Sequence, residues 1–183
     1  MQFKRKDLLF SLCGLNCSLC PSFVQGTCPG CRAGSHCAAV CPFAPCSVEH
    51  GNVSYCFECG EYPCRHYDGV DKHDSLITHK NQLKDIEKAK QIGIDKYHEE
   101  QTVKKQILDE LLDNYDVGNK EIFLCLAVNL LDIEDLKDIL NKADLSTKDM
   151  DLADKYYYIK QLFNDCGEKR GIELKLRRDG YYG

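Results

Sequence analysis

Thirteen cysteines make thiol chemistry the strongest chemical signal in this 183-residue chain. Eleven of them lie between Cys13 and Cys64, and only Cys125 and Cys166 follow. Three pairs have CxxC spacing, in which a tight turn can aim both sulfur atoms at one ion: Cys17/Cys20, Cys28/Cys31 and Cys56/Cys59. One such pair is a weak signal. Three pairs close together, with further cysteines between them, predict a metal-binding segment.

Zinc is the metal that we expect, because it takes four thiolate ligands in tetrahedral geometry. The predicted ligands are ten cysteines, namely Cys13, Cys17, Cys20, Cys28, Cys31, Cys41, Cys46, Cys56, Cys59 and Cys64. Their number suits two or three zinc ions. Two four-ligand sites use eight of the eleven clustered cysteines, whereas three sites need a twelfth ligand, which His36, His50 or His66 would supply.

The spacing suggests two quartets of ligands. The first expected quartet consists of Cys17, Cys20, Cys28 and Cys31. The second joins Cys56, Cys59 and Cys64 with Cys46, or with Cys41 in place of Cys46. Cys13, Cys37 and Cys41 are the hardest to assign, and Cys37 stays outside the predicted ligand set.

Two alternatives to zinc remain open. An iron–sulfur cluster is also held by four thiolates, and it would make the protein a redox carrier or an enzyme. Cys13, Cys17 and Cys20 even have the spacing of the radical S-adenosylmethionine cluster loop, but the chain lacks the alternating strands and helices of that much larger barrel. The other alternative is a set of reduced structural cysteines without metal.

The free energy of folding favours a bound metal as the group that stabilises the first part of the chain. Its apolar residues other than cysteine are few and scattered, and a segment of about sixty residues is only marginally stable through core burial. A structural zinc site contributes about 10–16 kcal/mol of apparent folding free energy in small peptides. Disulfides are not expected, because we find no export signal and the number of cysteines is odd.

The residues between the cysteines carry a family resemblance. The three stretches concerned are Cys13-Gly14-Leu15-Asn16-Cys17-x-x-Cys20-Pro21, Cys28-x-Gly30-Cys31-Arg32 and Cys56-x-Glu58-Cys59-x-x-x-Pro63-Cys64. Over about residues 10 to 66 the chain resembles the prokaryotic cysteine-rich family catalogued as domain of unknown function 3795. The resemblance implies a compact module of zinc-binding type and implies no reaction. Cys37 departs from the family pattern.

The elements that position these cysteines fall into two predicted domains. Residues 1–66 hold all five prolines and form a small metal-stabilised cysteine-rich module. Residues 67–183 form a mainly α-helical domain, with helices expected from Ser75 to Gly93, from Val103 towards Gly118 and from Ile122 to Leu131.

The C-terminal part of this domain has three further expected elements. A short helix is expected from Asp132. A long amphipathic helix, opened by a capping pattern of Ser146 and Asp149, is expected to carry Leu152 to Cys166. Alternation from Ile172 to Arg177 predicts a short C-terminal strand.

The charge and hydropathy of the chain limit the classes of function that we expect. The net charge of −5, with only five basic residues through Arg65, argues against nucleic acid as a partner. No apolar run is long enough to span a bilayer, so we expect a cytoplasmic protein without a membrane partner. Closed four-thiolate sites leave no position for substrate, so an enzyme is less expected than a binding or scaffolding module with a protein partner. Cys125, Cys166 and His79 are expected to have structural roles.

Overall fold

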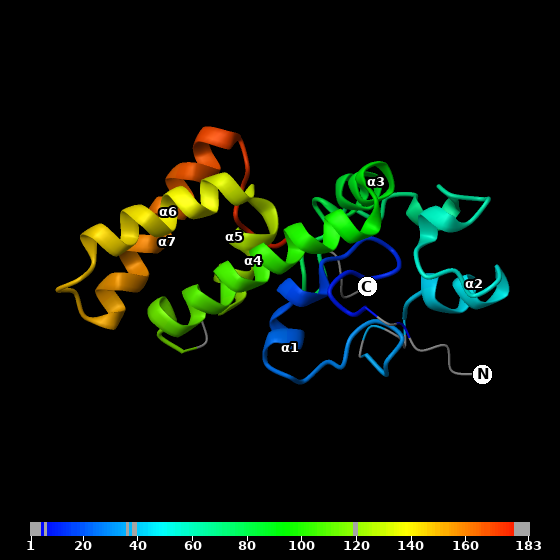
Figure 1. The fold of residues 1–183 in the computed structure, drawn as a ribbon, viewed down its shortest axis with the longest axis horizontal. Helices are drawn as coiled ribbons and strands as arrows, with labels where there is room; N and C mark the ends of the chain where they lie inside the picture. Colours follow the sequence, from blue (N-terminus) through cyan, green and yellow to red (C-terminus); the bar gives the residue numbers. More distant parts are fainter. Residues whose placement is uncertain (1–4, 6, 36, 38–39, 119–120, 178–183) are drawn as a thin grey trace. The chain divides into compact units, whose positions relative to one another are not determined.

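The computed structural model describes residues 5, 7–35, 37, 40–118 and 121–177 (Figure 1). Its contacts divide the chain into two compact units. The first unit comprises residues through Gln101 together with the segment from Arg177, and the second comprises Thr102–Leu176. This division lies well beyond residue 66, where the composition of the chain changes.

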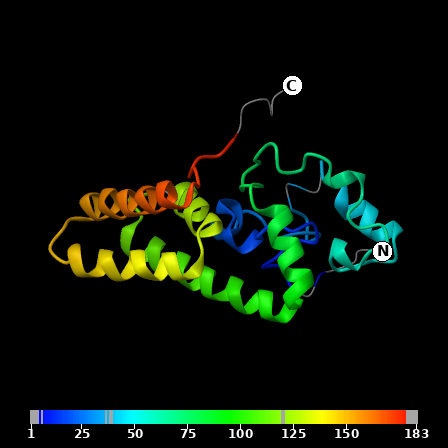
Figure 2. The same ribbon diagram turned by 90° about the horizontal axis from the view of Figure 1, so that it is seen from above.

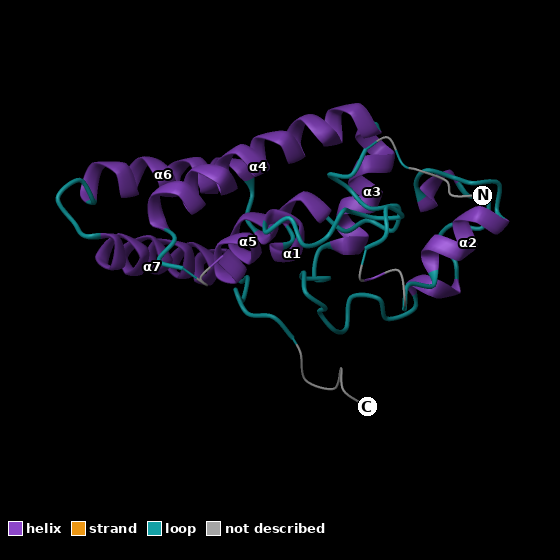
Figure 3. Cartoon of the chain, turned by 90° about the horizontal axis from the view of Figure 1, so that it is seen from below, coloured by secondary structure: helices purple, strands orange, loops and turns teal. Residues whose placement is uncertain are grey.

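The first unit consists mostly of short helical turns joined by loops, as the loop colour in Figure 3 shows. Its elements are η1 (Cys17–Leu19), α1 (Pro21–Val24), α2 (Phe43–Glu49), η3 (Cys56–Glu58), η4 (Arg65–Tyr67) and α3 (Gln82–Ile92). Helix α4 (Ile94–Tyr115) begins in this unit and ends in the second. The prolines and glycines among the cysteines prevent longer helices before residue 66.

An aromatic-rich core holds the first unit together. Its buried members are Phe10, Leu12, Cys13, Phe43, Tyr55, Tyr67, Ile86, Ala89 and Tyr97. The last three of these belong to α3 and α4, so the cysteine-rich segment shares a core with helices that follow it. The approach is close, because Gly14 has a φ of 101° and a Cβ there would lie 2.7 Å from the carbonyl oxygen of Gln82.

The second unit is a set of packed helices. After the C-terminal part of α4 come α5 (Glu121–Leu130), α6 (Ile133–Ser146) and α7 (Leu152–Arg170). Helices α6 and α7 lie side by side and run in opposite directions (Figure 2). The fully buried side chains of this unit include Leu111, Leu124, Leu136, Ile159 and Phe163. Among the described helices, none is long and apolar enough to cross a membrane.

The sequence pattern located the longer helices and misplaced several ends. Helix α5 confirms the buried helix predicted over Ile122–Leu131, and α7 confirms the long amphipathic helix. The predicted start at Ser75 is wrong, because α3 begins at Gln82 and residues 75–81 form a loop. The predicted cap at Ser146 is also wrong. The carboxylate of Asp151 caps α7 by accepting the Asp154 N–H at 2.9 Å.

The predicted C-terminal strand is wrong as well, because no strand occurs in the part of the chain that the structure describes (Figure 3). Alternating side chains favour extended backbone, but a strand also needs a partner with which to form a ladder of hydrogen bonds. Residues 172–177 find none. Ile172 instead packs against Gly167 of α7, while the backbone of Arg177 bonds to Asp74. The mainly helical character is confirmed, but no metal-stabilised module is shown.

Candidate metal centre

The thirteen cysteines are all free thiols, and those of the first unit gather in three groups. We name these groups by their position: the pocket group (Cys46, Cys56, Cys59, Cys64), the central group (Cys13, Cys17, Cys31, Cys41) and the loop group (Cys20, Cys28, Cys37). Members of each group interact electrostatically with one another, and sulfurs of different groups interact as well, such as Cys17 with Cys20 and Cys37 with Cys31. Of the two quartets expected from the sequence, the second is gathered with Cys46 rather than Cys41.

The pocket group is the best defined, because its four cysteines line one small pocket of about 20 Å³. Phe43, Val53 and Tyr62 supply apolar walls, so the sulfur atoms are its main donor atoms. Burial raises the pKa of Cys56 to about 12, and a hydrogen bond from Tyr67 opposes that effect, while nearby Cys64 and Cys46 add to it.

Short local elements bring the pocket group together. Cys56 and Cys59 flank the 3₁₀ turn η3, in which the Cys59 N–H donates to the carbonyl of Cys56 at 3.0 Å. Side chains three residues apart lie on the same side of such a turn. Glu58 fixes the start of η3, because its carboxylate accepts a hydrogen bond from the backbone N–H of Ser54 at 2.8 Å. Helix α2 presents Cys46 and is anchored through buried Phe43, whose ring lies 4.9 Å from that of Tyr67.

The central group lies against the shared core. Cys13 is 6 % exposed, and its sulfur lies 3.2 Å from the Ser11 hydroxyl. Burial raises the pKa of Cys13 strongly, and the nearby sulfurs of Cys31, Cys41 and Cys56 add to that rise. Cys17, whose pKa burial also raises, has Cys31, Cys13 and Cys20 as neighbours. Cys17 and Cys31 belong to the first expected quartet, and Cys17 also neighbours a third member of it, Cys20.

The loop group contains the other half of that quartet, Cys20 and Cys28. Burial raises the pKa of Cys20, backbone N–H groups of Phe23 and Ser22 oppose the shift, and the neighbouring Cys28 adds to it. Cys37 joins these two sulfurs, although the family pattern excludes it from the predicted ligands. His36, one of the three histidines proposed as a twelfth ligand, lies outside the described residues.

The described thiols fit zinc in their chemistry but not in their arrangement. In the described ranges, no set of three or more Cys, His, Asp or Glu side chains is arranged closely enough to hold a metal ion. The donor chemistry nevertheless fits zinc, because thiols are its preferred structural ligands and four of them line one pocket. The thiols are gathered but do not form a closed tetrahedral site.

A wider cleft of about 680 Å³ adjoins the pocket group and shares Cys46, Cys64 and His50 with the small pocket. Glu49, Glu61 and His66 also line it. His50 caps the C-terminus of α2, and its Nε2 lies 3.5 Å from Oε1 of Glu61. The sequence proposed His50 and His66 only as spare ligands, and it gave no signal for Glu61, which belongs to no recognisable motif.

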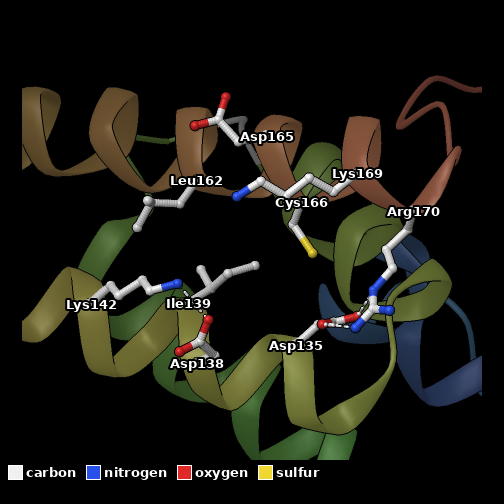
Figure 4. Close-up of a pocket in the computed structure, with 9 residues that line it drawn as sticks. All are labelled: Asp135, Asp138, Ile139, Lys142, Leu162, Asp165, Cys166, Lys169 and Arg170. Carbon is white, nitrogen blue, oxygen red and sulfur yellow. Dashed lines mark hydrogen bonds and ion pairs between the residues drawn. The ribbon is translucent and has the colours of Figure 1, made fainter.

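A second pocket, of about 320 Å³, lies in the second unit between α6 and α7 (Figure 4). The sulfur of Cys166 points into it beside Ile139 and Leu162. Its charged walls are partly neutralised, because Arg170 donates two hydrogen bonds to Asp135, at 2.9 and 2.7 Å. A lone thiol between paired charges indicates no reaction. Cys125, the remaining cysteine, is 1 % exposed on α5.

Comparisons with protein-family models, with curated proteins and with solved structures found no match. The resemblance to the family catalogued as domain of unknown function 3795 therefore stays an expectation from the sequence.

Proposed function

We propose that this chain is a zinc-binding protein whose thiol groups hold two or three structural zinc ions. In this proposal the pocket group holds one ion, and the central group holds a second. The loop group, which offers three thiols, accounts for the optional third ion. The metal-bound segment then acts as a binding or scaffolding surface for a protein partner.

One observation carries the proposal: four cysteines from three separate elements and loops line a single pocket of about 20 Å³. Four uncoordinated thiols gain little from such crowding. A zinc ion would favour their ionised form and would bind all four at once. Free thiols also suit a reducing compartment such as the cytoplasm, where they persist without forming disulfides.

The same donor set explains why we propose binding rather than catalysis. Four protein ligands fill the coordination sphere of zinc, so no position remains for water or substrate. Such a site stabilises a fold and positions the surface around it. The stability that it supplies is large for a small segment, since a structural zinc ion contributes about 10–16 kcal/mol of apparent folding free energy in peptides.

Elemental analysis of the full chain, purified without oxygen, tests the proposal. We expect two or three zinc ions per chain and no iron. The double variant C56S/C59S should lose one zinc ion, because it removes half of the pocket group. C166S is the matched control, since Cys166 lies in the groove of the second unit, and its zinc content should equal that of the unaltered chain.

Two outcomes would contradict the proposal. A metal-free protein with all thirteen thiols reactive would show that the cysteines are merely structural. Iron with visible absorbance would instead assign the thiols to an iron–sulfur cluster.

A further inference from the structure

We propose that His50 and Glu61 form an exchange site at which a hydrated zinc ion binds as it passes between solvent and the pocket group. This inference rests on the proposed function, because it requires zinc in the pocket group. It adds a second kind of site, one that is open and transient.

The hydrogen bonds of His50 fix which ring nitrogen is available. Its Nδ1 lies 2.9 Å from the carbonyl oxygen of Cys46, which can only accept, so Nδ1 carries a hydrogen and donates it. In the neutral ring, Nε2 then presents a lone pair. The Nε2 atom lies 3.5 Å from Oε1 of Glu61, which is a second acceptor. When the ring carries a second proton, Nε2 donates to Glu61 as an ion pair, and a zinc ion that binds Nε2 would take the place of that proton.

The spacing of these two atoms suits zinc. Zinc binds imidazole nitrogen and carboxylate oxygen at about 2.0–2.2 Å, and in tetrahedral geometry such ligands lie about 3.4 Å apart. The observed separation of Nε2 and Oε1 is 3.5 Å. A zinc ion can therefore bind both atoms with little movement of either side chain, and water would complete its coordination.

The position of the pair connects solvent to the thiols. His50 follows Cys46 by one helical turn, and its Nδ1 lies 3.5 Å from the sulfur of Cys46. Cys46, Cys64 and His50 line both the small pocket and the wide cleft. An ion held by Nε2 of His50 therefore lies on the solvent side of two of the four proposed thiol ligands.

Exposure explains why this site would exchange its ion rather than keep it. The side chains of His50 and Glu61 are 33 % and 71 % exposed, so water competes for the ion. Two protein ligands also bind zinc far more weakly than four thiolates. In the same cleft, Glu49 adds attraction for a cation and Arg65 opposes it.

Transfer of zinc from the loaded full chain to an excess of a chromophoric chelator tests the inference. The variants H50Q and E61Q should retain the zinc content of the unaltered chain. The pocket-group ion, which is the ion that C56S/C59S lacks, should leave more slowly in both variants, because its open route to solvent is lost. H73Q and E99Q are matched controls at exposed positions outside both pockets, and their rates should not change.

Each result has one meaning. Unchanged or faster release in H50Q and E61Q, with zinc content intact, would overturn the exchange site and leave the proposed function standing. This is the result expected if His50 and Glu61 form only an ion pair. A chain that carries no zinc at all would overturn both proposals.

Discussion

Asp74 shows how one buried charge can connect distant parts of the first unit. Its side chain is fully buried, and it accepts hydrogen bonds from the backbone N–H of His79 at 2.7 Å and from that of Arg177 at 2.7 Å. The guanidinium of Arg177 lies 3.0 Å away and supplies the opposite charge. Asp74 therefore fixes the loop before α3 and the extended segment after α7.

This arrangement predicts a pH dependence. Burial alone would raise the pKa of Asp74, but hydrogen bonds from Arg177 and His79 and the charge of Arg177 outweigh it and lower the pKa below the usual value. A lowered pKa in the folded state contributes stability above about pH 4, and this stability is lost as the pH falls through the folded pKa. D74N should cost about 3 kcal/mol of unfolding free energy near neutral pH.

Urea unfolding of the unaltered chain and D74N, measured from pH 7 down to pH 3, checks this prediction. The difference in unfolding free energy between them should stay constant to about pH 4 and then shrink. D113N, at an exposed position of α4, is the control and should cost little at any pH. A difference that grows towards low pH would contradict the role given to Asp74.

At the scale of elements, the loop Cys13–Asn16 packs against α3 and α4 through backbone and polar contacts. The side chain of Gln82 donates to the carbonyl of Cys13 at 3.0 Å, and Tyr97 donates to the side-chain oxygen of Asn16 at 2.9 Å. Gly14 makes the close approach possible, since it has no Cβ to meet α3. The position of the first CxxC turn therefore depends on helices that begin more than sixty residues later.

G14A should test this contact directly. An added Cβ would lie 2.7 Å from the Gln82 carbonyl oxygen and 2.8 Å from Cβ of Ile86, at a φ of 101° that also strains alanine. We expect a loss of about 2–4 kcal/mol in unfolding free energy, measured by chemical denaturation. Gly51 also has positive φ, 87°, but nothing lies within 4 Å of its added Cβ. G51A should therefore cost only about 1 kcal/mol, and equal losses in the two variants would refute the close packing.

The helices that the sequence predicted well are those with a strong apolar pattern, such as α5 and α7. Helix starts were predicted less well, because tertiary contacts decide them. Asp74, for example, accepts a hydrogen bond from the backbone N–H of His79, and this contact holds residues 75–81 outside α3.

The grouping of Cys46 with Cys56, Cys59 and Cys64 was one of two sequence alternatives, and only the fold of α2 against η4 selects it.

For the molecule as a whole, composition and contacts divide the chain at different places. The prolines and the cluster of eleven cysteines end near residue 66, but the first compact unit extends to Gln101 and includes Arg177. The reason is the shared core, in which Ile86, Ala89 and Tyr97 cover side chains of the cysteine-rich segment. Apolar packing therefore stabilises the part of this segment around Phe10 and Leu12, and Phe43, Tyr55 and Tyr67 belong to the same core. The part around the pocket group depends, in our proposal, on zinc.

Amide hydrogen exchange before and after zinc is removed by a chelator, with all thiols kept reduced, tests this account most directly. We predict that residues 43–66, which carry the pocket group, lose their protection when zinc leaves. Helices α5, α6 and α7 should keep theirs and serve as the internal control. Unchanged protection of residues 43–66 in the zinc-free, reduced chain would contradict the claim that metal bonds fold this segment.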